Sequence, residues 1–199
     1  QLWNSYSFFA TYASVDGYNP NKNKVNYIDF SIMDKWIISK LNVFIRDCNS
    51  SLEQFRSDIM MRKFDLFLDD LSNWYIRRSR RRFWKSEDDL DKQTAYQVLY
   101  ECLTTVIKLI SPVLPFVTEE IYQNLVKNID SDEHESIHLC DYPSSDLKKI
   151  DIELMKNIDS LRRVVELGRS ARNKAKIKIR QPLSELHFHV TDKKVANFI

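Results

Sequence analysis

The spacing of apolar residues along the chain predicts a set of long amphipathic helices. From Ser31 onward, apolar side chains recur every three or four residues, at Ile37, Leu41, Phe44, Cys48, Leu52 and Phe55. A similar stripe predicts a second helix over residues 64–84, at Phe64, Phe67, Leu68, Leu71, Trp74 and Tyr75. A third is expected over 90–110, at Ala95, Val98, Leu99, Cys102, Leu103, Val106 and Leu109. Pro112 ends this third helix, and Pro115 can begin a fourth. Each of these four helices can bury its apolar stripe only against another helix. A mainly α fold, a helical bundle, is therefore predicted.

The two ends of the chain differ from this pattern. Residues 2–14 are aromatic nearly all round, which predicts a connector helix that packs against more than one neighbour, and the polar stretch 16–29 is expected to be a linker. A fifth helix is expected over 146–173. Beyond it, basic and apolar residues alternate over 174–180 and again over 186–190, the period of a strand. We therefore expect a small β element near the C-terminus and three parts, 1–28, 29–145 and 146–199.

Composition narrows the functional classes. The chain has 199 residues and only 2 glycines, which excludes a glycine-rich phosphate loop and disfavours an all-β fold. Its formal net charge of +2 is too small for the whole surface to attract nucleic acid, so such a surface must be a local patch. Three widely separated cysteines indicate reduced thiols and a cytoplasmic location. Neither a signal peptide nor a membrane partner is expected. Because the chain begins with Gln1 rather than Met, we expect a piece of a longer protein.

The strongest candidate site is the arginine-rich run at the end of the second predicted helix, residues 73–84. Arginine donates paired hydrogen bonds to phosphate, and neighbouring aromatic rings can stack on unpaired RNA bases. On a helix these arginines spread over roughly 200°, so they cannot all contact one partner. Arg78 continues the apolar stripe and is expected to pack inside against a carboxylate. The candidates for RNA contact are Arg77, Arg80, Arg81, Arg82 and Trp84.

Other interpretations of these residues stay open. The arginines could pair with Glu87, Asp88, Asp89 or a neighbouring domain, with Trp74 and Trp84 in the core. The basic residues of the predicted strand, which could follow an RNA backbone or form the solvated face of an edge strand, are Lys174, Lys176, Lys178 and Arg180. His187 and His189 lack a third ligand, so no metal site is expected. Asp69 and Asp70 point in different directions on a helix, and no catalytic residue is expected.

Five motifs cover nearly the whole chain, and they are residues 3–13, 34–41, 71–84, 109–116 with Glu119-Glu120-Ile121-Tyr122, and 179–183. In their residues and in their order along the chain, these motifs resemble the isoleucyl-tRNA synthetase family. The proline-phenylalanine and glutamate motif is shared with valyl and leucyl enzymes. The aromatic N-terminal run and the arginine-rich run favour isoleucine.

This resemblance implies an α-helical anticodon-binding domain that recognises the anticodon stem and loop of tRNA(Ile). It also implies that a Rossmann-type catalytic domain of the same protein precedes it and covers residues 1–14. The family's ATP signatures have no match here, so the resemblance implies ATP with Mg for the parent enzyme and no cofactor for this chain. Two alternatives remain: a helical docking module that only braces the catalytic domain, or the same domain of a valyl or leucyl enzyme.

Overall fold

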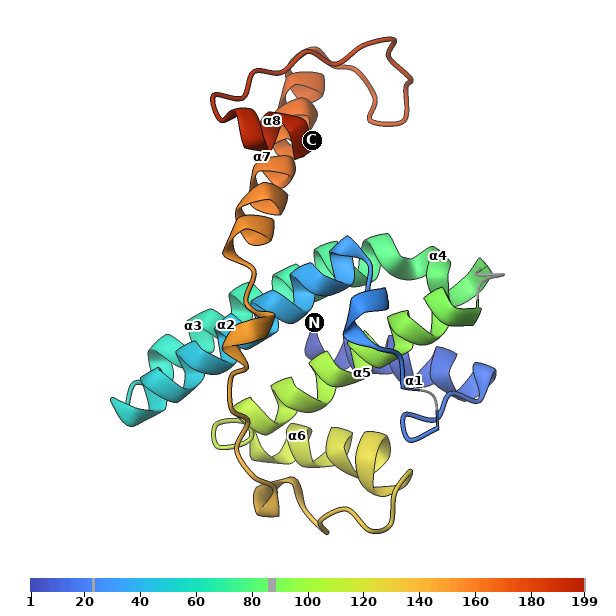
Figure 1. The fold of residues 1–199 in the computed structure, drawn as a ribbon, viewed down its shortest axis with the longest axis vertical. Coiled ribbons are helices and arrows are strands. Elements are labelled where there is room, and N and C mark those ends of the chain that lie inside the picture. The colour runs from blue at the N-terminus through green and yellow to red at the C-terminus, as the bar shows by residue number, and fades with distance from the viewer. Residues whose placement is uncertain (23, 86–88, 199) are drawn as a thin grey trace. The chain divides into compact units, whose positions relative to one another are not determined.

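Helices make up most of the described part of the chain, residues 1–22, 24–85 and 89–198 of a computed structural model (Figure 1). The α-helices are α1 (Leu2–Asp16), α2 (Ile32–Glu53), α3 (Ser57–Asp69), α4 (Arg77–Lys85), α5 (Asp89–Ile110), α6 (Pro115–Tyr122), α7 (Ile152–Lys174) and α8 (Lys193–Phe198). Two π-helical segments, η2 (Asp70–Ile76) and η3 (Gln123–Lys127), extend α3 and α6. Short 3₁₀ turns are η1 (Tyr27–Asp29), η4 (Ile137–Leu139) and η5 (Leu147–Lys149). The predicted mainly α fold is confirmed.

The chain divides into two compact units, Gln1–Ile150 and Asp151–Ile199. The first holds α1 to α6, and the second holds α7 and α8. The three-part division expected from the sequence stays a prediction. None of the described helices combines the length and apolar character that a membrane crossing requires.

The start and end of α2 follow from local chemistry. Ser31 caps the helix, because its side chain accepts a hydrogen bond from the Asp34 N–H while the Asp34 carboxylate accepts one from the Ser31 N–H. At the other end Phe55 adopts a left-handed conformation with φ 56°, and the Arg56 N–H returns to the Ser51 carbonyl at 2.8 Å. This reversal leads directly into α3, which lies beside α2 (Figure 1). Phe55, expected on the buried stripe, is instead 94% exposed.

The core of the first unit forms around α5, which contacts α1, α2, α4 and α6. All seven residues of the predicted α5 stripe are fully buried. Large aromatic side chains from four different elements complete this core, namely Trp36, Tyr75, Tyr96 and Tyr122. Burial of this apolar surface, aliphatic and aromatic together, is the main favourable contribution to the stability of the unit.

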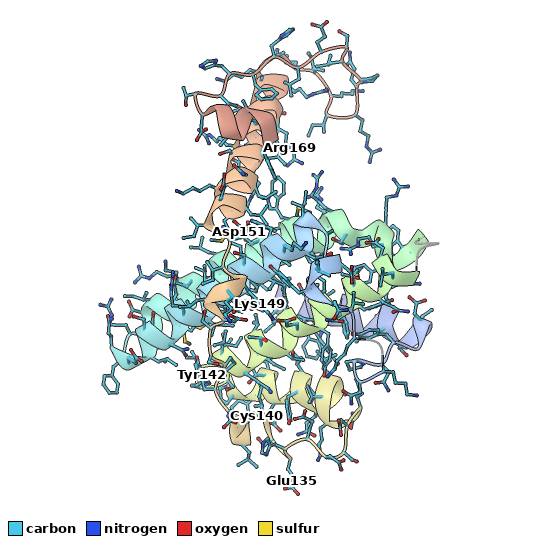
Figure 2. The ribbon with its side chains drawn as sticks, in the orientation of Figure 1. Glu135, Cys140, Tyr142, Lys149, Asp151 and Arg169 are labelled. Carbon is cyan, nitrogen blue, oxygen red and sulfur yellow. The ribbon has the colours of Figure 1, made fainter. Side chains whose placement is uncertain are left out.

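An irregular segment from Glu135 to Lys149, which includes η4 and η5, runs along the helices of the first unit (Figure 2). The Tyr142 hydroxyl donates to the Leu109 carbonyl at 2.8 Å, and this satisfies a carbonyl in the last turn of α5. Further along, the Ser145 hydroxyl donates to the Asn42 carbonyl, and Lys149 pairs with Glu101 at 3.1 Å. The segment therefore ties α2 to α5 before the second unit begins.

The second unit begins with a capped helix and continues in irregular backbone. The Asp151 side chain accepts a hydrogen bond from the Leu154 N–H at 2.8 Å, which starts α7 (Figure 2). No strand occurs among the described residues, so the predicted β element is not seen. Lys174 is the last residue of α7, and Lys176 takes a left-handed conformation with φ 54°.

Hydrogen bonding explains why the alternation over 174–180 does not form a strand here. The Ile177 N–H donates to the Arg172 carbonyl at 2.9 Å, and the Lys176 N–H donates to the Asn173 carbonyl at 3.1 Å, which together form a Schellman cap. The Arg172 guanidinium then donates to the Lys178 and Gln181 carbonyls at 3.1 and 2.7 Å. A strand needs a partner strand for these groups, whereas the helix end and Arg172 satisfy them locally.

Candidate nucleic-acid interface

The arginine-rich run lies on α4, and its register is set by the π-helical segment η2 that precedes it. A π turn contains one more residue than an α turn, so it displaces every later position around the helix axis. The buried stripe accordingly moves by one residue, to Tyr75, Ser79 and Phe83. Arg78, predicted to pack inside against a carboxylate, is exposed and lies over the Trp74 ring at 5.8 Å. That prediction was wrong because it assumed an unbroken α-helix.

Arg82 occupies the inward position instead. Its guanidinium makes two parallel hydrogen bonds to the Asp34 carboxylate, at 2.7 and 2.9 Å, and pairs with Asp91 at 2.8 Å. The Asp34 side chain is fully buried and that of Arg82 is 15% exposed. Tyr75 completes the group by donating its hydroxyl hydrogen to Asp34 at 2.6 Å. This cluster joins the start of α2 to η2, α4 and α5.

The electrostatics of the cluster favour its charged form. Burial alone would raise the pKa of the Asp34 carboxyl, but the hydrogen bonds and charge of Arg82, with the hydrogen bonds of Tyr75 and Ser31, lower it overall. Burial and the nearby Asp34 charge raise the pKa of Tyr75 well above its usual value, so this residue remains a neutral donor. Arg82, predicted as a tRNA contact, is thus committed to an internal pair.

The remaining candidates lie together on the opposite side of α4. At about 100° per residue, they occupy an arc of roughly 100°. We call this surface the α4 face, and its residues are Arg77, Arg80, Arg81 and Trp84. All four side chains are exposed, and Trp84 is 52% exposed. Among the described residues, no carboxylate forms an ion pair with its three arginines. Glu87 and Asp88, weighed as partners, lie outside the described residues, as does the side chain of Asp89.

Helix α1 brings aromatic rings to the edge of the α4 face. The Arg80 guanidinium lies over the Phe8 ring at 5.9 Å, and the Tyr12 ring lies 6.2 Å from the ring of Trp84. Both Phe8 and Tyr12 are half-buried. The sequence predicts only a packing role for these two residues. Their place in a helix that is aromatic on several faces was the available signal, but it does not say which face meets α4.

The basic residues of the second unit form a separate candidate surface. Lys174, Lys176, Lys178 and Arg180 are all exposed. They follow the end of α7 and the turn held by Arg172 rather than one face of a strand. These residues belong to the second unit, whereas the α4 face belongs to the first.

Other reactive side chains do not form a site in the described part of the chain. Cys48 and Cys102 are buried, and Cys140 is half-buried, all as free thiols. Burial, together with nearby carboxylates, raises the pKa of Cys48 to about 12 and that of Cys102 well above its usual value. His187 is exposed and lies 2.8 Å from Glu185. No group of three or more potential metal ligands occurs among the residues searched.

Comparison with known proteins adds a second line of evidence. Residues 34–187 match the family model described as the anticodon-binding domain of tRNA ligase. The chain is 49% identical over 185 residues to an isoleucine–tRNA ligase of Clostridium novyi (strain NT), which covers 93% of this chain. It is 47% and 48% identical to enzymes of the same name from two strains of Dehalococcoides mccartyi, also over 93% of this chain. The chain spans 18% of the length of each of these three relatives.

Proposed function

Because the chain belongs to the family of anticodon-binding domains of tRNA ligases, we propose that it recognises the anticodon stem and loop of tRNA(Ile) through the α4 face. The observation that carries this proposal is the separation of roles within one helix. Arg82 is paired with buried Asp34, while Arg77 and Arg81 stand exposed with no described carboxylate partner. An exposed guanidinium group without a carboxylate partner can donate two parallel hydrogen bonds to the oxygens of a phosphate group.

The isoleucine specificity is supported by the names of the relatives. The three described above are isoleucine–tRNA ligases, which favours tRNA(Ile) over the tRNAs of the valyl and leucyl enzymes. We propose that the longer protein attaches isoleucine to this tRNA in the cytoplasm, using ATP with Mg bound to a catalytic domain outside this chain. The exposed run from Lys174 to Arg180 would add phosphate contacts of lower specificity.

Binding measured across a salt series tests the proposal. The 199-residue chain should bind a tRNA(Ile) transcript more tightly than non-cognate transcripts, and the affinity should fall as salt rises. Arg77→Glu combined with Arg81→Glu should weaken binding at least about tenfold and lower the salt slope by about two, since two phosphate contacts are lost. Lys176→Glu combined with Lys178→Glu should lower the slope to a similar or smaller extent.

A matched control keeps the change of charge and alters only its position. Arg56 and Arg62 are exposed arginines of the first unit that both pair with Asp58. Replacing both with Glu should leave tRNA affinity close to that of the wild type. If the Arg77/Arg81 variant binds as well as this control variant, the α4 face is not the tRNA contact.

A groove at the start of α1 favours a second contact, with the catalytic domain of the same protein. It has a volume of about 600 Å³ and is lined by the apolar residues Leu2, Trp3, Phe64, Leu68, Leu114 and Val117 and by the polar residues Gln1, Asp65 and Asp69. Trp3 is 48% exposed beside it, an arrangement suited to an apolar protein surface. Such a contact would explain how this chain could brace the catalytic domain, while the α4 face would still bind RNA. Trp3→Ala in the full-length enzyme should weaken the association of the two domains but leave the tRNA affinity of this chain unchanged.

A further inference from the structure

Two aromatic rings from distant parts of the sequence meet at the edge of the α4 face. Tyr12 comes from α1 and Trp84 from α4, and their rings lie 6.2 Å apart with an interplanar angle of 42°. Trp84 is 52% exposed, so much of its indole remains open to solvent. An exposed indole beside a second ring, in a cationic setting, is a combination that packing alone does not require.

The pair is anchored to the core through a series of ring contacts. Tyr12 lies against Phe8 with ring centroids 4.8 Å apart, and Phe8 meets the edge of Phe83 at 5.1 Å. Phe83 is buried and contacts Tyr96 of α5 at 4.9 Å in a T-shaped arrangement. This series of contacts already restrains the Tyr12 ring. The binding of a ligand that stacks on the pair therefore costs less side-chain entropy.

The charges around the pair select the kind of ligand. Arg81 and Trp84 are three residues apart on α4, so they are neighbours on its surface, and Arg80 flanks them on the side of Phe8. A nucleotide presents a flat base and a phosphate joined by a sugar, which matches an exposed ring beside a guanidinium group. An apolar protein segment would leave these arginines without anionic partners.

We propose that Tyr12 and Trp84 form a stacking site for one unpaired base of the tRNA anticodon loop, with Arg81 on the adjacent phosphate. The inference rests on the proposed function and extends it, because it names the element that distinguishes an open loop from a paired stem. The arginines supply affinity for any RNA backbone, whereas the ring pair accepts only a base that is free to leave its helix.

The test compares two RNA probes on the 199-residue chain: a hairpin with an anticodon-type unpaired loop, and a fully paired RNA of the same length. The wild type should prefer the hairpin. Trp84→Ala and Tyr12→Ala should each weaken hairpin binding about five- to a hundredfold, the effect of losing one stacked base, and should change duplex binding little. Trp84→Phe and Tyr12→Phe should retain most of the preference because they keep a ring. Circular dichroism confirms that each variant is folded.

A second readout and a matched control separate stacking from a structural role. Indole fluorescence should be quenched when the hairpin binds, and this quenching should be lost in Trp84→Phe. Trp3→Ala removes another exposed tryptophan of similar exposure, 48%, and should leave hairpin binding unchanged. If Trp84→Ala and Tyr12→Ala keep the wild-type preference, or if no quenching occurs, the stacking site is wrong even though tRNA binds. If the wild type binds neither RNA nor intact tRNA(Ile) at low salt, the proposed function itself fails.

Discussion

The two basic segments of this chain, α4 and the run from Lys174 to Arg180, both carry several positive charges but are held in place differently. On α4, the register set by η2 is held from the inside by the Arg82–Asp34 pair, and the outward arginines share one face. In the second unit, a Schellman cap and the Arg172 guanidinium shape the backbone, and the lysines follow a turn. The comparison shows that the arrangement of a cationic surface depends on the contacts that fix its backbone, not on the number of charges.

The largest expected effect distinguishes Arg82 from its neighbour Arg81. Arg82→Ala should destabilise the first unit by about 3–5 kcal/mol, because it leaves the fully buried Asp34 carboxylate without its cationic partner. Arg81→Ala removes an exposed side chain and should change the free energy of unfolding by less than about 0.5 kcal/mol. Chemical denaturation followed by far-UV circular dichroism measures both. Equal effects of the two substitutions would show that the register of α4 does not depend on the buried pair.

Acid should weaken the same anchor. The pKa of Asp34 in the folded chain is lowered from 3.8, because burial, the largest single influence, raises it, while Arg82, Tyr75 and Ser31 together lower it by more. The ion pair therefore contributes its full stability above the pKa of an unfolded aspartate, and this contribution is lost as the pH falls through the folded value. The stability difference between wild type and Asp34→Asn should be constant near neutral pH and should narrow below about pH 4. A difference that stays constant down to pH 2 would contradict this origin.

The smallest expected effect concerns the helix cap of the second unit. Lys176 has φ 54°, a conformation that costs a residue with a Cβ roughly 1 kcal/mol relative to glycine. Lys176→Gly should therefore slow hydrogen exchange at the Lys176 and Ile177 amides, which donate to the last carbonyls of α7. Lys178 has no such conformation, so Lys178→Gly serves as the control and should leave exchange unchanged or make it faster. Faster exchange in Lys176→Gly would show that the cap does not hold this segment.

Much of the fold could be predicted from the sequence because its signals are local. The start of α2 after Ser31 depends on a side chain and a carboxylate three residues apart, and the end of α5 depends on a proline two residues beyond it. The buried stripe of α5 was predicted correctly at every position. Phe55 was wrongly predicted to be buried, because the apolar spacing does not show that the chain reverses at this residue to place α3 beside α2. The fate of residues 174–180 depended on whether a partner strand existed, which alternation alone cannot show.

The candidate site was predictable in composition but not in geometry. Arginines and Trp84 were identified from their density in one run, and the structure places three of those arginines with Trp84 on one exposed face. Which arginine turns inward could not be deduced, since an extra residue in η2 has no distinct sequence signature. The contribution of Tyr12 was also hidden, because it depends on a contact between residues far apart in the chain.

The π-helical segment η2 accommodates one residue more than an ordinary helix would over the same rotation. Deleting one residue within Asp70–Ile76 and restoring an ordinary helix would therefore leave Arg82 facing Asp34, because the lost residue and the lost π turn cancel. Converting η2 to an α-helix at unchanged length would instead turn everything after it by about 100° and exchange the inward arginine for a neighbour in the run. Over evolutionary time, this point of the chain could therefore gain or lose one residue without redirecting the surface of α4.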